Sequence, residues 1–153
     1  MIPAYHAGYV VDASVGVKWF AEGENHTEQA ISLRDHYLGG HCRVAVPNWL
    51  FFLEIANAMG RKKGFAEEST ARVLRNLWGY RFELVEPHEG LLTKTNAISR
   101  GYRASIYDSA YVAVAEATGF PLVTADAELL KRMKGHSIVL PLWELEFPPA
   151  SGV

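Results

Sequence analysis

The feature that most constrains the fold is an alternation of short apolar runs with longer amphipathic stretches. Runs rich in apolar and β-branched residues predict strands at 9–11, 44–46, 82–85, 122–124 and 138–140. The stretches between them predict helices at 15–20, 25–38, 48–63, 67–78, 89–100, 105–118 and 128–134. Such alternation favours an α/β fold with a mainly parallel sheet, in which ligands lie beyond the carboxyl ends of the strands.

Two of these predicted helices carry start signals. Asn25, with Glu28 three residues later, has the pattern of a capping box. Pro47 stands where proline is tolerated, at the first position of the helix that follows. These two signals set the expected beginnings of the helices at 25–38 and 48–63.

Composition bounds the class of protein. A length of 153 residues suggests one domain over 1–153, with its core at about 8–142. The formal net charge of -2 gives no overall basic excess for nucleic acid, but it leaves room for a local basic patch. Cys42 is the only cysteine, the first residues lack a signal-peptide pattern, and no apolar run is long enough to cross a membrane. We therefore expect a cytoplasmic protein with no membrane partner, and a frayed tail over 147–153.

Four acidic residues stand where a site is expected. Asp12 and Asp126 each follow a predicted strand, Asp108 lies in the first turn of a helix, and Glu54 interrupts an apolar helix. In a doubly wound sheet these positions can converge on one rim. Carboxylates are the preferred protein ligands of Mg²⁺ and Mn²⁺, and clustered carboxylates with such cations cleave phosphodiesters. The four acids therefore predict a metal-dependent site.

Each acid taken singly also has a structural interpretation. Ser105 with Asp108 fits a capping box, and Asp126 fits a helix N-cap. Asp12 is compatible with either role. Glu54 is the most informative, because a buried carboxylate on an apolar helix requires a cation, a salt bridge or an exposed groove.

Four motifs, in order, resemble those of one family. They are VVDASV at 10–15 followed by KWF at 18–20, EIANA at 54–58, YDSAYVAVA at 107–115, and LVTADAEL at 122–129. The chain resembles the PIN-domain nucleases, and most of all the VapC-type ribonuclease toxins of prokaryotic toxin–antitoxin pairs. The resemblance covers about residues 8–142.

The resemblance implies a three-layer α/β/α sandwich around a mainly parallel sheet, with Mg²⁺ or Mn²⁺ at its edge. It also implies endoribonuclease activity on RNA, a homodimer, and inhibition by a cognate antitoxin. Asp12, Glu54 and Asp108 match the family's three principal acids, and Asp126 matches a fourth of more variable role. Positions matched to supporting polar groups are Ser14, Asn57 and Thr124.

Basic and apolar residues suggest partner surfaces. Arg100 and Arg103 precede the Asp108 helix, so we expect them to contact RNA phosphates near the rim. The cluster at 61–63 is at least as well explained as a solvated helix end favoured by the helix dipole. The apolar run at 49–52 exceeds what one helix usually hides, which leaves surface for a dimer or antitoxin interface.

Other functions stay open at this point. A PIN nuclease could serve RNA processing without an antitoxin, which an upstream antitoxin gene would distinguish from a toxin. A non-catalytic interaction domain would use the acids structurally and show no dependence on divalent metal. Phosphatases of the aspartyl-phosphate type also place an Asp after the first strand, but Ser14 stands where they need a second Asp.

Overall fold

The structure of the chain is a computed structural model that describes residues 2–3 and 6–147. The strands are β1 (Ile2–Pro3), β2 (Gly8–Val11), β3 (Arg43–Pro47), β4 (Glu83–Val85), β5 (Leu122–Thr124), β6 (Val139–Pro141) and β7 (Leu145–Glu146). The helices are α1 (Ala13–Gly16), α2 (Thr27–Leu38), α3 (Leu50–Gly60), α4 (Glu67–Gly79), α5 (Glu89–Tyr102), α6 (Ile106–Thr118) and α7 (Ala127–Arg132). Two 3₁₀ turns complete the described elements, η1 (Val17–Trp19) and η2 (Leu142–Glu144).

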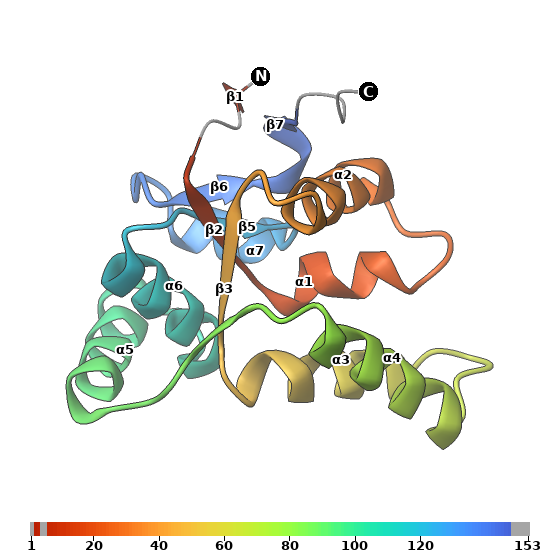
Figure 1. Cartoon of the computed structure of the whole chain (residues 1–153). Coiled ribbons are helices and arrows are strands. Elements are labelled where there is room, and N and C mark those ends of the chain that lie inside the picture. The colour runs from red at the N-terminus through yellow and green to blue at the C-terminus, as the bar shows by residue number, and fades with distance from the viewer. Residues whose placement is uncertain (1, 4–5, 148–153) are drawn as a thin grey trace.

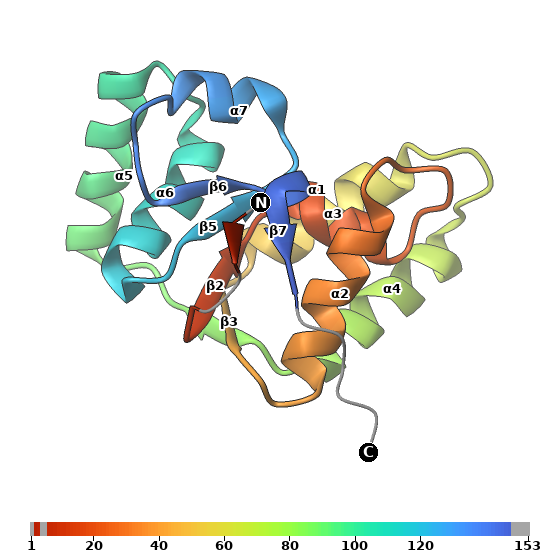
Figure 2. The ribbon, with the colours of Figure 1, turned by 90° about the horizontal axis from the view of Figure 1, so that it is seen from above.

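Five of the described strands form one sheet in the order β4-β3-β2-β5-β6, and every neighbouring pair in it is parallel. β1 and β7 form a separate parallel pair. Helices α5 and α6 cover one face of the large sheet, and α1 to α4 lie on the other (Figure 1). The three layers are clearest from above, with the strands between the two groups of helices (Figure 2). The predicted α/β class with a mainly parallel sheet is confirmed.

The centre of the sheet explains why its carboxyl edge carries the site. All four residues of β2 and all three of β5 are buried, as expected for strands covered on both faces. Val11 on β2 is in register with Val123 on β5, so both strands end at the same edge. Asp12 and the residues after Thr124 therefore leave the sheet side by side.

A close approach of two helices brings α3 to the same edge. Gly16, at the end of α1, packs against Ile55 and Phe51 of α3. A Cβ at position 16 would stand 2.5 Å from the Ile55 Cδ1 atom, a contact that real side chains do not make. The missing side chain thus lets α1, which follows Asp12, lie against the helix that carries Glu54.

The capping box predicted at Asn25 and Glu28 is wrong. Helix α2 begins at Thr27, and its N-cap His26 has a left-handed backbone (φ 59°) and makes no side-chain cap. Instead, the Thr27 hydroxyl donates to the carbonyl oxygen of Glu24 at 2.8 Å. This contact belongs to a turn that fixes Glu24 just before the helix.

The start predicted for the next helix is also wrong. Pro47 is the last residue of β3, in register with Val85 of β4, and not the first residue of a helix. The chain then turns sharply at Trp49, whose φ is 72°, and the Leu50 N–H donates to the Asn48 carbonyl at 2.8 Å. Helix α3 therefore begins at Leu50, because pairing with β4 holds Pro47 in the sheet.

In the part of the chain that the structure describes, no helix is both long and apolar enough to cross a membrane. The tail predicted to fray begins at Phe147, and residues 148–153 lie outside the described residues.

Candidate active site

Asp12 is held at the end of β2 by contacts to both of its carboxylate oxygens. It is the N-cap of α1, and its Oδ1 accepts from the Val15 backbone N–H at 3.3 Å. The Ser14 hydroxyl donates to Oδ1 and the Thr124 hydroxyl donates to Oδ2. With 4% of its surface exposed, Asp12 is a buried carboxylate of fixed orientation.

Ser14 and Thr124 belong to one hydrogen-bonded network that joins the two central strands. The Ser14 Oγ accepts from the Ala125 N–H at 2.9 Å, and the Thr124 Oγ1 accepts from the Asp126 N–H at 3.1 Å. Both hydroxyls thus connect Asp12 to the backbone that follows β5. The structure brings both predicted supporting hydroxyls to Asp12, and their part in a reaction stays a prediction.

The pKa of Asp12 is raised to about 6. Burial is the largest cause, since it disfavours the charged form. Hydrogen bonds from Ser14, Thr124 and the Val15 backbone lower the pKa, and the nearby charge of Asp108 raises it. A carboxylate in this setting gains strongly from a neighbouring cation.

Glu54 lies in the middle of α3 and is the least satisfied acid of the predicted set. Its Oε1 atom is buried and has no hydrogen-bond partner among the described residues. The pKa of Glu54 is raised to about 7, first by burial and then by the charges of Asp108 and Asp12. Of the cation, salt bridge or exposed groove expected for Glu54, the structure shows an open cleft beside it, and the cation stays a prediction.

Asp108 lies in the first turn of α6 and is half-buried. The Ser105 hydroxyl accepts from the Asp108 backbone N–H at 3.0 Å, so Ser105 caps the helix. Burial raises the pKa of Asp108, hydrogen bonding to Ser105 lowers it, Asp126 raises it and Arg132 lowers it, with a net rise. Helix capping explains the role of Ser105, but the Asp108 carboxylate still interacts electrostatically with the other acids.

Asp126 differs from the other three because its carboxylate is already used. It is the N-cap of α7, and its Oδ1 accepts from the backbone N–H groups of Glu128 at 2.9 Å and Leu129 at 3.2 Å. Its charge raises the pKa of Asp108, which places it at the same rim. The structural interpretation of Asp126 is thus well supported, and a further role stays a prediction.

The charges of neighbouring acids raise the pKa values of Asp12, Glu54 and Asp108, but the described residues do not form a complete set of metal ligands. In residues 2–3 and 6–147, no three acidic, histidine or cysteine side chains are placed together closely enough to hold a metal ion. Two observations nevertheless fit a hard divalent cation: the unpartnered Glu54 Oε1 and the raised pKa values of three neighbouring carboxyls. A cation shared by Asp12, Glu54 and Asp108 would relieve both.

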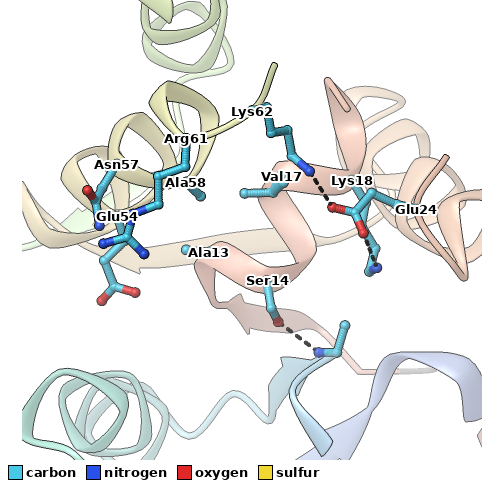
Figure 3. Close-up of a pocket in the computed structure, with 11 residues that line it drawn as sticks. Ala13, Ser14, Val17, Lys18, Glu24, Glu54, Asn57, Ala58, Arg61 and Lys62 are labelled. Atoms are coloured by element: carbon cyan, nitrogen blue, oxygen red, sulfur yellow. Dashed lines mark hydrogen bonds and ion pairs between the residues drawn. The ribbon is translucent and has the colours of Figure 1, made fainter. Parts of the chain in front are cut away.

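A cleft of about 560 Å³ opens beside these acids, between α1 and α3 (Figure 3). Glu54 and Asn57 line it from α3, and Ser14 and Ala125 line it near the carboxyl edge of the sheet. The remaining lining residues are Ala13, Val17, Lys18, Glu24, Ala58, Arg61 and Lys62. The cleft therefore joins part of the predicted site to residues to which the sequence assigned no role.

Lys18, Glu24 and Lys62 form an ion cluster on the side of the cleft away from Glu54 (Figure 3). The Glu24 carboxylate lies 3.1 Å from the Lys62 ammonium and 3.7 Å from that of Lys18. The hydrogen bond from Lys62 is the largest cause that lowers the pKa of Glu24. Sequence reasoning missed this cluster; Lys18 stands in a family motif, but Glu24 carries no local signal.

The predicted RNA-contacting residues lie at the end of α5. Arg100 is exposed in the last turn of α5, and Arg103 is the left-handed residue that ends that helix. The Arg103 carbonyl accepts from Arg132 at 2.7 Å, and Arg132 lowers the pKa of Asp108. Arg132 thus connects Arg103 to the acids, whereas neither Arg100 nor Arg103 lines the cleft.

Comparison with known proteins supports this architecture. The family model described as the PIN domain matches residues 9–135. Among solved structures, PAE2754 from Pyrobaculum aerophilum is 24% identical with a TM-score of 0.65, covering 90% of this chain and 85% of that one. No protein with a curated description matches the sequence significantly.

Two further structures come from toxin–antitoxin systems. VapC20 of Mycobacterium tuberculosis, a Sarcin-Ricin loop cleaving toxin, is 14% identical with a TM-score of 0.61, over 80% of this chain and 93% of that one. VapBC2 from Rickettsia felis, bound to a DNA fragment from its promoter, is 14% identical with a TM-score of 0.62, over 92% and 99%. At these identities the likeness shows a shared fold.

Proposed function

The chain belongs to the PIN domain family of nucleases, and from that premise we propose that it is a metal-dependent endoribonuclease. Asp12, Glu54 and Asp108 are its principal catalytic and metal-binding acids in this proposal, and Asp126 assists them. The cofactor is Mg²⁺ or Mn²⁺, and the substrate is RNA. We also propose that the whole chain, residues 1–153, forms one such domain.

The observation that carries the proposal is the unpartnered carboxylate oxygen of Glu54. A buried charged group without a hydrogen bond is costly, and two further carboxyls nearby increase that cost. An ordinary structural acid is paired, as Glu24 is in the same cleft. These features of Asp12, Glu54 and Asp108 support a cation site rather than a structural cluster of acids.

The chain's own residues would divide the work as follows. Asp12, oriented by Ser14 and Thr124, would hold a cation together with Glu54 and Asp108. A bound divalent cation supplies a water of lowered pKa and stabilises charge on the phosphoryl oxygens. Attack of water on phosphorus and departure of the 3′ oxygen would leave a 5′-phosphate and a 3′-hydroxyl.

A cleavage assay tests this proposal. Purified protein is incubated with single-stranded RNA and Mg²⁺ or Mn²⁺, with and without EDTA, beside the Asp108→Ala variant. We expect cleavage that requires the metal, is lost in the variant, and yields 5′-phosphate ends. No cleavage by the wild type, or 2′,3′-cyclic phosphate products, would contradict the proposed chemistry.

We further propose that the protein is the toxin of a VapBC-type pair. Support comes from the fold it shares with VapC20 and with the VapBC2 complex. Expression of the chain alone should then arrest bacterial growth, and Asp12→Ala should relieve the arrest. Equal and harmless expression of both forms would favour a PIN nuclease of RNA processing, or an interaction domain.

An antitoxin and a second copy of the chain are the proposed protein partners. Support comes from an apolar groove of about 590 Å³ between α3 and α4, where Trp49 is 72% exposed and Trp78 61% exposed. Exposed aromatic side chains of this kind are enriched at protein interfaces. The sequence expectation of spare apolar surface at 49–52 applies to Trp49, whereas Phe51 is buried in the core.

We propose a cytoplasmic location. Support comes from the single cysteine of the sequence, Cys42, which is buried and free. A thiol in that setting suits a reducing compartment.

A further inference from the structure

The cleft beside the acids is more basic than the chain as a whole. The whole chain has a formal net charge of -2. The charged residues that line the cleft are three cations and two acids: Lys18, Arg61, Lys62, Glu24 and Glu54. The cleft lining therefore has a formal charge of +1, with Lys62 and Lys18 beside Glu24 and the Arg61 side chain extending toward Glu54 (Figure 3).

Glu24 neutralises only part of this charge. Its two oxygens are shared between two ammonium groups, Lys62 at 3.1 Å and Lys18 at 3.7 Å (Figure 3). Lys18 is buried, at 8% exposure, so Glu24 is the counter-ion that makes its burial tolerable. Lys62 is more exposed, faces the cleft, and is left with donors for another anion.

Arg61 adds a charge that has no counter-ion among the residues that the structure describes. Among the described residues it makes no ion pair and no side-chain hydrogen bond, although it lines the cleft as the residue that ends α3. Its guanidinium extends back along α3 toward Glu54, while Lys62 lies across the cleft beside Glu24 (Figure 3). A nucleic-acid strand that enters the cleft can thus meet positive charge on both sides.

Position distinguishes these cations from an ordinary basic helix end. The helix dipole would favour any of the three basic residues at 61–63 equally. Arg61 and Lys62 line the cleft that Glu54 lines, whereas Lys63 does not. The sequence offers no way to separate these three residues, and the structure separates them.

We propose that Arg61 and Lys62, with Lys18 behind them, form a phosphate-binding subsite for the RNA strand. This inference rests on the proposed nuclease function. The guanidinium of Arg61 can bind two phosphate oxygens, and Lys62 adds a point charge held in place by Glu24. The subsite binds the RNA backbone beside the acids, and so it positions the strand without reading its bases.

Binding without cleavage tests the subsite separately from the reaction. Full-length protein is titrated into a fluorescein-labelled single-stranded RNA of about 12 nucleotides, and anisotropy is read in EDTA at several salt concentrations. The variants are Arg61→Ala, Lys62→Ala and the matched control Lys63→Ala. Circular dichroism and thermal melting show that each variant is folded.

We expect Arg61→Ala and Lys62→Ala each to weaken binding about fivefold and to reduce the slope of log K against log salt by about 0.7. Lys63→Ala should change affinity by less than about twofold. A merely structural role would lower the melting temperature without changing the salt slope. Because the Arg61 side chain makes no ion pair or hydrogen bond within residues 2–3 and 6–147, its variant keeps the test independent of the Glu24 cluster.

Three results would overturn the subsite. They are a wild type that binds no RNA, equal losses in all three variants, and wild-type affinity in both Arg61→Ala and Lys62→Ala. In the last case, these cations would bind an acidic protein segment instead of RNA. If binding falls as expected but no cleavage occurs with Mg²⁺ or Mn²⁺, the subsite stands and the nuclease proposal fails. If metal-dependent cleavage occurs but Arg61→Ala and Lys62→Ala bind RNA as tightly as the wild type, the nuclease proposal stands and the subsite fails.

Discussion

Two glutamates line the same cleft in opposite electrostatic environments. Glu54 has a buried, unpartnered oxygen, and burial with two neighbouring acids raises its pKa to about 7. Glu24 is held by Lys62 and Lys18, and the Lys62 hydrogen bond is the main cause that lowers its pKa. Among the described residues, Glu54 makes no ion pair, whereas Glu24 makes two.

This difference separates a site that needs a cofactor from one that is complete. The protein supplies Glu24 with its own counter-ions, so that end of the cleft keeps its charge and geometry without a ligand. It supplies Glu54 with more negative charge instead. Burial and neighbouring acids disfavour the charged forms of Asp12, Glu54 and Asp108, and a bound ligand can offset this cost. A divalent cation is the ligand that carboxylates bind best.

The largest expected effect contrasts the two glutamates in cleavage. Glu54→Gln should reduce metal-dependent RNA cleavage at least about 1000-fold, because it removes a charged metal ligand. Glu24→Gln should reduce cleavage less than about tenfold, since Glu24 only holds lysines in place. Initial cleavage rates of both folded variants measure the contrast. Similar losses of rate would contradict the distinction between Glu54 and Glu24.

The second effect is on stability and pH in metal-free protein. For Asp12 and Glu54 the folded pKa lies above its unfolded value, so the native state binds more protons and stability falls as pH rises through about 7. Asp12 alone should account for a loss of about 3 kcal/mol between about pH 4 and pH 8, and the partly exposed Glu54 should add a smaller loss. Thermal melts in EDTA across this range measure it.

Two controls accompany these melts. Glu54→Gln should reduce the pH dependence to the part that Asp12 contributes, and Mn²⁺ should restore stability at high pH. Glu24, whose pKa is lowered, has the opposite sign: its contribution is present at high pH and is lost as pH falls. A wild-type melting temperature that rises steadily from pH 5 to pH 8 in EDTA would show that the acid rim is not strained.

A smaller effect tests whether Glu24 stabilises the ion cluster with Lys18 and Lys62. Glu24→Gln leaves buried Lys18 without its counter-ion, which should lower the free energy of unfolding by about 1 kcal/mol at neutral pH. Urea unfolding measures this change, and Glu22→Gln, outside the ion cluster, is the matched control. A fully stable Glu24→Gln variant would mean that the cluster holds Lys18 by other contacts.

The smallest effect concerns Asp126. Asn caps a helix about as well as Asp, so Asp126→Asn should change stability by less than about 0.5 kcal/mol. We expect cleavage to fall no more than about tenfold, because the Asp126 carboxylate already accepts two backbone N–H groups. A loss as large as that of Glu54→Gln would rank Asp126 with the principal acids.

Sequence predicted the sheet well because its strands are nearly continuous apolar runs. Leu122–Thr124 is both the predicted strand and β5, and parallel pairing follows from the helices between the runs. The errors fall where tertiary contacts override local signals. Pairing with β4 retains Pro47 in β3, and the turn at Glu24 starts α2 later than the pattern at Asn25 predicts.

The candidate site divides in the same way. Asp12 and Asp126 are predictable because strand ends and helix starts mark them, and family motifs mark Glu54 and Asp108. Glu24 is not predictable, since its role comes from lysines 6 and 38 residues away. The separation of Lys62 from Lys63 likewise depends on which face of the helix end meets the cleft, and residue type does not encode it.

The most direct test of the central claim is calorimetric titration of Mn²⁺ into metal-stripped protein, comparing wild type with Asp12→Asn and Glu24→Gln. We predict that the wild type binds Mn²⁺, that Asp12→Asn weakens binding at least about tenfold, and that Glu24→Gln stays within about threefold. Absent binding in the wild type would contradict the assignment of the cation to the acid rim. So would a loss confined to Glu24→Gln.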